Sequence, residues 1–282
     1  MVMSAKEALR QFAMDRNMDY FGVAPVSRFT NLPEGYRPAD YLAKAKSVIV
    51  IGKKVPNSAL LAHQAAFSDT MRHAISSYIL FGYLKINSAL DEVLYQYTYH
   101  IERHYHAVSF PVPTSEPRNE ETGLSLLSNR YAAVCAGLAQ FGLSGRAVNA
   151  RHGARVRYGS LITELELEPD DIDRETKLCN PDVCDICIKA CPAQALSANK
   201  KITVCIEDFE TSYAQRNKAK CKCAVYGLIK GTPGRLQADL PEAMETMEDW
   251  YRFNKTDDPW QRMEFTHGNY CDLCMVKCPL GQ

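Results

Sequence analysis

Hydrophobic and polar positions over the first 170 residues follow patterns that predict both helices and strands. Residues 5–17 have the spacing of an amphipathic helix, and Ser4 with Glu7 three positions later has the form of a capping box. Short apolar runs at 20–24 and 47–55, rich in β-branched residues, predict strands. This part of the chain should therefore form a layered domain with a packed core.

The same patterns continue toward residue 170. Residues 60–105 predict a long helical stretch that is broken near Gly82, and residues 106–112 predict a strand. A helix is expected over 127–142, ended by Gly142, and a strand or hairpin over 154–167. Strands separated by helices predict an α+β (α/β) fold built on a central sheet, without fixing its topology.

Cysteine usage divides the chain into two regions. The first contains only Cys135, and the other ten of the 11 cysteines lie between residues 179 and 282. The acidic, proline-bearing stretch ELEPDDIDRETK between the regions is typical of a connection. We therefore expect two domains, at 1–170 and 171–282.

Charge and hydropathy exclude several classes of protein. Lys plus Arg equals Asp plus Glu, at 33 each, so the net charge gives no argument for a nucleic-acid or membrane partner. The N-terminus has neither the order of a signal peptide nor a twin-arginine pair, and no window has eighteen uninterrupted apolar residues. These features predict a cytoplasmic protein, in which cysteines indicate metal or redox chemistry rather than disulfides.

The stretch CNPDVCDICIKACP, residues 179–192, has the spacing C-x4-C-x2-C-x3-C-P. Two-cluster ferredoxins have C-x2-C-x2-C-x3-C-P, in which the fourth cysteine reaches the other cluster. The C-terminal CDLCMVKCPLGQ repeats the C-x2-C-x3-C-P half. Exchange of the two Cys-Pro cysteines predicts a first four-iron, four-sulfur (4Fe–4S) cluster held by Cys179, Cys184, Cys187 and Cys278.

The second 4Fe–4S cluster then has Cys191, Cys271 and Cys274, and lacks one ligand. The candidates are Cys205, Cys221 and Cys223. We favour Cys205, because it opens an apparent helix, CIEDFETSYAQR, and helix starts direct backbone N–H groups at anions. Two structural zinc sites are the alternative, although zinc ribbons do not require the Cys-Pro halves whose exchange completes the ligand count.

The stretch FGLSGRAVNARHGARVRYGS, residues 141–160, combines glycines with arginines. Glycine permits close approach of a bulky cofactor to the backbone, and arginine suits anionic groups. A glycine-bearing hairpin with exposed arginines explains the same composition. The residues alone leave both interpretations open.

The order of these segments resembles that of the cobalamin-dependent reductases, which include epoxyqueuosine reductases and reductive dehalogenases. The resemblance covers nearly the whole length and rests on ALRQFAMDRNMDYFGVAPV, LPEGYRPADYLAKAKSVIVIGKKVP, RYAAVCAGLAQFGLSG, RYGSLITELELEPD and both Cys-Pro motifs. It implies a nitroreductase-like corrinoid-binding domain beside a smaller ferredoxin-like module with two 4Fe–4S clusters. A family ligand some fifteen residues after the first Cys-Pro motif corresponds to Cys205.

The resemblance also implies a cofactor site and a reaction. Cobalamin-contacting residues would be Gly142, Ser144, Gly145, Arg146, Gly159 and Ser160. The chain is thus expected to be an iron–sulfur oxidoreductase that passes single electrons through two clusters to a bound corrinoid, which reduces a small substrate. The alternative is a non-catalytic corrinoid-binding or electron-delivery protein.

Departures from the family pattern limit what can be carried over. Epoxyqueuosine reductases have a catalytic aspartate before the central helix, where this chain has EETGLSLLSNRYAA with Thr122 nearest that position. Glu121 and Tyr131 are therefore the candidate proton donors. The chain ends at Gln282 without the family's helical tRNA-binding extension, so no tRNA is expected, and no twin-arginine leader is present.

The expected partners follow from the same reasoning. An electron-donor protein such as a ferredoxin or a flavodoxin would supply electrons to the clusters, and a small molecule or a corrinoid would accept the electrons. No membrane partner is expected. Because nitroreductase-like domains often pair, a homodimer is compatible with the resemblance.

Overall fold

A four-stranded antiparallel sheet lies at the centre of the protein. The computed structural model describes residues 3–68, 70–115, 124–234, 238–254 and 270–281. The strand order is β1-β2-β6-β3, formed by β1 (Tyr20–Pro25), β2 (Ser47–Lys54), β6 (Val156–Thr163) and β3 (Ser109–Val112). The strands expected at 20–24, 47–55, 106–112 and 154–167 are all present.

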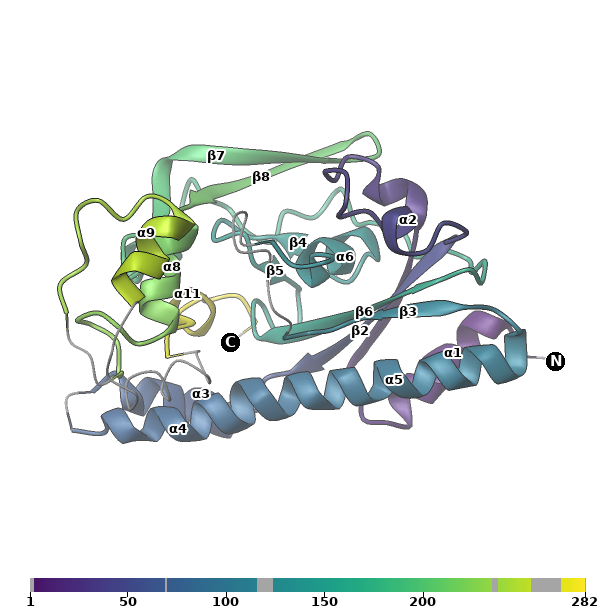
Figure 1. Ribbon diagram of the computed structural model, residues 1–282, viewed down its shortest axis with the longest axis horizontal. Coiled ribbons are helices and arrows are strands. Elements are labelled where there is room, and N and C mark those ends of the chain that lie inside the picture. The colour runs from purple at the N-terminus through teal and green to yellow at the C-terminus, as the bar shows by residue number, and fades with distance from the viewer. Residues whose placement is uncertain (1–2, 69, 116–123, 235–237, 255–269, 282) are drawn as a thin grey trace.

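Helices cover one face of this sheet. The helices α1 (Ala5–Met14) and α5 (Lys85–Tyr105) pack here, with α3 (Asn57–Ala66) beyond the end of the sheet (Figure 1). Ile49 and Ile51 of β2 point into this core, whereas Val48 and Val50 point into the opposite one. A strand buried on both faces needs a continuous apolar run, which explains the sequence SVIVIG. The predicted Ser4–Glu7 capping box is confirmed.

The opposite face carries a second layer. It contains the short helices η1 (Val26–Phe29), α2 (Pro38–Tyr41) and α6 (Asn129–Cys135), and the two-stranded sheet of β4 (Gln140–Phe141) and β5 (Ala147–Val148). Above it lies a hairpin of β7 (Leu196–Ile206) and β8 (Phe209–Arg216), on the side of the molecule away from α5 (Figure 1). The resulting fold is α+β, as the sequence predicted.

The expected long helix over 60–105 is interrupted. After α3 come η2 (Arg72–Ala74), α4 (Ile75–Ser77) and the π-helix η3 (Tyr78–Leu84), which leads into α5. The predicted break near Gly82 is instead a π-helical stretch, because Gly82 lies in η3 and the chain stays helical from Ile75 to Tyr105. A Cβ at this position would lie 2.7 Å from the Tyr78 ring, so glycine lets that ring pack in the core.

One predicted helix is shorter than expected, and another is wrong. The helix expected over 127–142 ends at Cys135, and Gly137 follows it with a φ of +69°, while Gly142 begins the turn between β4 and β5. The segment CIEDFETSYAQR is not a helix but the end of β7 and all of β8. Its residues Ile206 and Ala214 are buried under the hairpin, so cross-strand pairing and burial outweigh local helix propensity.

The C-terminal region adds short helices around a small core. These are α7 (Ile186–Lys189), α8 (Lys218–Val225), α9 (Met247–Asn254) and α11 (Leu273–Val276). Met275 and Val276 of α11 pack into the same core as α1 and α5, which joins this region to the central domain. Among the described helices, none is both long and apolar enough to cross a membrane.

Candidate functional site

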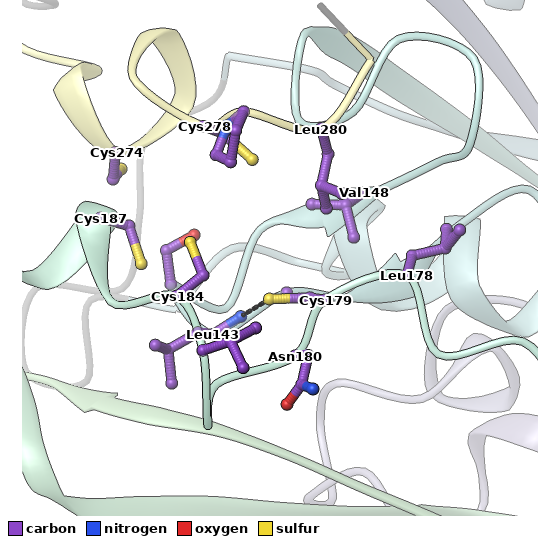
Figure 2. Close-up of a pocket in the computed structure, with 14 residues that line it drawn as sticks. Leu143, Val148, Leu178, Cys179, Asn180, Cys184, Cys187, Cys274, Cys278 and Leu280 are labelled. Atoms are coloured by element: carbon purple, nitrogen blue, oxygen red, sulfur yellow. Dashed lines mark hydrogen bonds between the residues drawn. The ribbon is translucent and has the colours of Figure 1, made fainter.

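Cysteines from two distant parts of the chain meet around one cavity. The cavity has a volume of about 180 Å³, and its walls include Cys179, Cys184, Cys187, Cys274 and Cys278. Figure 2 shows three of these on the segment around α7 and two on the C-terminal segment that faces it. The remaining walls are largely apolar, from Leu143, Val148, Leu178, Val183, Pro279 and Leu280. The structure thus brings together all four residues predicted for the first cluster.

The electrostatics of these thiols agree with their proximity. Burial, together with the neighbouring Cys274, Cys179, Cys278 and Cys184, raises the pKa of Cys187 to about 12. Burial also raises the pKa of Cys179, whose Sγ accepts a hydrogen bond from the Leu143 N–H at 3.3 Å (Figure 2). In the metal-free protein these thiols therefore favour the neutral form, and metal binding must displace their protons.

A second group of thiols lies next to the first. Burial raises the pKa of Cys271, and Cys274 and Cys221 are among the neighbours that raise it further. Burial likewise raises the pKa of Cys221, with Cys274 and Cys191 contributing. Cys191, Cys221 and Cys271 pack in the same small core, and Cys274 is an electrostatic neighbour of Cys221 and Cys271.

Backbone hydrogen bonds fix both ends of the helix that carries Cys221. At its start, the N–H of Asn217 donates to the carbonyl of Ala195 at 2.8 Å, and the N–H of Ala195 donates to Cys191 Sγ at 3.3 Å. At its end, the N–H of Tyr270 donates to the carbonyl of Val225 at 2.8 Å. The helix α8 is therefore held between Cys191 and the segment that begins the C-terminal motif.

Cys205 is not brought together with these thiols. It lies near the tip of the β7–β8 hairpin, nine residues beyond Leu196, a span of up to about 30 Å along a strand. Its Sγ donates to the Glu210 carboxylate at 3.5 Å, and its carbonyl accepts from Asn31 Nδ2 at 2.9 Å. The choice of Cys205 over Cys221 rested on a helix that does not form and on the family resemblance, and the geometry favours Cys221.

Cys223, the third candidate, points elsewhere. It lies two residues after Cys221 on α8, which places the two side chains on opposite sides of the helix. Cys223 is fully buried in the small core with Trp250 and Leu228, and burial raises its pKa to about 12. Its side chain is a packing element of that core.

A buried carboxylate lies inside the C-terminal motif. Asp272, between Cys271 and Leu273, adopts a left-handed conformation with φ +72° and is 4% exposed. It accepts hydrogen bonds from Tyr78 Oη at 2.7 Å, from Arg157 Nη2 at 3.0 Å and from Arg146 Nη2. One carboxylate thus connects the C-terminal motif to the π-helix, to β6 and to the β4–β5 turn.

Arg146 connects the second thiol group to a polar cavity. Its Nε donates to Cys274 Sγ at 3.2 Å while its Nη2 holds Asp272. The polar cavity has a volume of about 250 Å³. Its polar walls consist of four arginines, two tyrosines, one carboxylate and several amides and hydroxyls. These are Arg130, Arg146, Arg157, Arg216, Tyr83, Tyr158, Asp272, Asn87, Asn129, Thr114, Ser125 and Ser128. Asn129 Oδ1 is buried and has no hydrogen-bond partner among the described residues, which leaves an acceptor for a ligand.

Part of this chain is similar in sequence to known enzymes. A tetrachloroethene reductive dehalogenase of Dehalobacter restrictus (strain DSM 9455 / PER-K23) is 27% identical over 178 residues, which cover 52% of this chain and 31% of the relative. A tetrachloroethene reductive dehalogenase of Desulfitobacterium hafniense is 26% identical over the same shares. The chain is similar to reductive dehalogenases. It spans about a third of the length of these curated relatives, and no family model matches it.

Solved structures extend the similarity of the fold to epoxyqueuosine reductases. An epoxyqueuosine reductase with an epoxyqueuosine-modified tRNA stem loop has a TM-score of 0.58 and 17% identity, covering 98% of this chain and 65% of that one. A catabolic reductive dehalogenase in complex with 3-bromo-4-hydroxybenzoic acid has a TM-score of 0.57 and 16% identity, over 93% and 34%. The mixed α+β fold of both enzyme groups is therefore shared by this chain.

Within this dehalogenase-like fold, the residues predicted to contact a corrinoid are dispersed. Gly142 and Ser144 line the cysteine cavity, and only Arg146 lines the polar one. Gly145 packs against the Tyr213 ring, which would lie 2.8 Å from a Cβ at that position. The turn from Gly142 to Arg146 thus belongs to a hairpin, as the alternative interpretation held, although Arg146 is largely buried instead of exposed.

The other two residues of that set, Gly159 and Ser160, lie inside the sheet. Gly159 faces α5, where a Cβ would lie 3.0 Å from Leu94, and Ser160 is fully buried and paired with Val50. Neither lines the cysteine cavity or the polar cavity. Both residues lie in the packed interior of the sheet.

The predicted proton donors have different outcomes. Glu121 lies outside the described residues. Tyr131 is buried in the core, where burial raises its pKa and its hydroxyl donates at 3.3 Å to the carbonyls of Arg28 and Cys205. The tyrosines that line the polar cavity are Tyr83 and Tyr158.

A glycine holds the C-terminal segment of the dehalogenase-like fold in place. Gly153 has a φ of +56°, and a Cβ there would lie 1.9 Å from the Leu280 carbonyl oxygen. Gly153→Ala should lower the free energy of unfolding by about 2–4 kcal/mol, because it combines backbone strain with a clash. Gly35→Ala is the control, since φ there is +81° and no atom lies within 4 Å. Denaturant unfolding that shows equal losses for both would contradict the clash.

Proposed function

We propose that this chain is an iron–sulfur reductase with two 4Fe–4S clusters that deliver single electrons to an acceptor in the polar cavity. The first would be held by Cys179, Cys184, Cys187 and Cys278, and the second by Cys191, Cys221, Cys271 and Cys274. The observation that carries the proposal is the pair of adjacent thiol groups, one of which contacts Arg146 at the wall of the polar cavity.

The chemistry around the thiols fits iron–sulfur clusters. Each proposed site has an N–H group that donates to a sulfur, from Leu143 to Cys179 and from Ala195 to Cys191. Such donors stabilise the negative charge of thiolate-bound clusters. When bound, the clusters supply one-electron transfer, and the protein holds their ligands in place and shields them with apolar walls.

The polar cavity is a better candidate for contacts with a corrinoid than the dispersed glycine set. Asn87, Thr114, Ser128 and the unpartnered Asn129 supply amide and hydroxyl groups, which suit the peripheral amides of a corrin ring. A corrinoid is larger than about 250 Å³ and would extend beyond the described walls. The structure of one reductive dehalogenase of this fold suggests a mechanism for B12-dependent dehalogenation. A bound corrinoid would supply a cobalt centre for the reduction.

This chain's own residues have three functions in the proposal. The arginines at the cavity orient an acceptor and offset negative charge that develops on it. Tyr83 and Tyr158 replace Tyr131 as candidates to hold a proton at a phenolic oxygen near the acceptor. An electron-donor protein such as a ferredoxin or flavodoxin would supply the electrons, and the acceptor would be a small molecule or a corrinoid.

Anaerobic reconstitution tests this function. We expect about eight iron and eight acid-labile sulfide per chain, the content of two 4Fe–4S clusters. Zinc without sulfide would contradict the proposal and favour the structural alternative. Addition of cobalamin, followed by cobalt analysis and electron paramagnetic resonance, tests the corrinoid. Sustained reduction of an organohalide or epoxide with a chemical reductant would distinguish an enzyme from a non-catalytic electron-delivery protein.

A further inference from the structure

The two proposed cluster sites have unequal electrostatic surroundings. The first is enclosed mainly by apolar side chains, with the Leu143 N–H as a sulfur donor. The second has a guanidinium in direct contact with a ligand, since Arg146 Nε lies 3.2 Å from Cys274 Sγ. Cluster potentials depend on nearby charge and on hydrogen bonds to the sulfurs. The contrast therefore bears on the order in which the clusters accept electrons.

Positive charge accumulates around the second site. Arg146 and Arg157 share the single carboxylate of Asp272, and both are largely buried, with side chains 23% and 13% exposed. Arg216 adds a further positive charge, because it lines the same polar cavity as Arg146 and Arg157. Burial of Arg146 and Arg157 limits screening by salt of the net positive charge that the shared carboxylate leaves.

The first site has weaker charge compensation. Arg155 is near it, but its guanidinium donates to the backbone carbonyls of Leu280 and Cys278 rather than to a sulfur. An apolar surrounding disfavours the extra negative charge of a reduced cluster. Val183, next to Cys184, is 81% exposed, which leaves the first site near the surface where a donor protein can approach.

We infer that Arg146 makes the second cluster the higher-potential one, so that electrons enter at the first cluster and leave from the second toward the polar cavity. The inference rests on the proposed function. Each transfer between the sites moves one electron, so the first cluster is oxidised by one electron when the second is reduced by one. A one-electron donor protein supplies the first site, and the acceptor in the cavity removes the electron from the second.

The position of Arg146 supports this direction. Among the described residues, Arg146 is the one that both donates a hydrogen bond to a sulfur of the second site and lines the polar cavity. Replacement by lysine keeps the charge but loses the planar fork that bonds to sulfur and carboxylate together. Arg146 is thus a positioning residue, and its replacement is expected to change the reduction potential of the second cluster.

Redox titration followed by electron paramagnetic resonance tests the inference on cluster-loaded full-length protein. The wild type should show two one-electron steps with separate midpoints. Arg146→Gln should lower the higher midpoint, changing the reduction equilibrium of that step about tenfold, which is about 59 mV for one electron. Arg146→Lys should shift it less. Arg155→Gln is the matched control and should leave the higher midpoint in place.

The result for Arg146→Gln separates failure of the inferred direction from failure of the proposed function. If Arg146→Gln retains eight iron and its lower midpoint shifts instead, the proposed direction of electron flow is reversed. If neither midpoint shifts, Arg146 does not set the potential of either cluster. If this variant loses iron, Arg216→Gln tests the same charge effect from the β8 side and should also lower the higher midpoint; an unchanged midpoint there would overturn the inference. Absence of iron and sulfide from the wild type would instead contradict the proposed function itself.

Discussion

Replacing Cys221 with alanine is expected to reduce the iron content of the reconstituted protein from about eight to about four per chain. The second thiol group would lose one of its four members, and the remaining three would not hold a complete cluster. Cys205→Ala should retain about eight iron, because Cys205 lies in the hairpin beside Glu210. Iron and sulfide analysis after anaerobic reconstitution measures both variants.

Cys223→Ala is the matched control on the same helix. It removes a buried thiol two residues from Cys221 and should leave the iron content unchanged. Loss of half of the iron in Cys205→Ala, with full iron in Cys221→Ala, would restore the ligand chosen from the sequence. It would also require the β7–β8 hairpin to lie elsewhere in the cluster-loaded protein.

Asp272→Asn is expected to destabilise the protein by about 3–5 kcal/mol, the cost of removing one partner from a buried charge network. Arg146 and Arg157 would both lose their shared carboxylate while remaining largely buried. Asparagine tolerates the left-handed backbone at this position, so the substitution removes the charge without adding strain. Denaturant unfolding of the reduced, metal-free protein measures the change.

An exposed ion pair provides the comparison. Asp239 pairs with Lys230 at 2.8 Å, with side chains 85% and 63% exposed, so Asp239→Asn should change stability little. If both variants unfold at the same denaturant concentration, Asp272 does not act as the buried link between the C-terminal motif, η3 and β6. A lower slope of the unfolding curve in Asp272→Asn alone would indicate partial opening of the C-terminal segment.

Local patterns were sufficient where a segment's own periodicity matched its final environment. The capping box before α1 needs only four consecutive residues, and the run SVIVIG needs only burial on both faces. The same reasoning was wrong for CIEDFETSYAQR, because its strand form depends on pairing with β7 and on the core beneath it. Long-range pairing of that kind is not encoded in the segment itself.

The sequence by itself determined the chemistry of the site: ten cysteines in the last hundred or so residues, two of them before proline, and a spacing that implies exchange of ligands between two clusters. Only the tertiary structure decided which thiols meet. Hydrogen bonds at Ala195 and Tyr270 place α8, and with it Cys221, beside Cys191 and Cys271, while the hairpin carries Cys205 away. The reason is physical: spacing along the chain constrains only near neighbours, whereas a ligand contributed from a distant segment is positioned by packing and backbone hydrogen bonds that involve the whole fold.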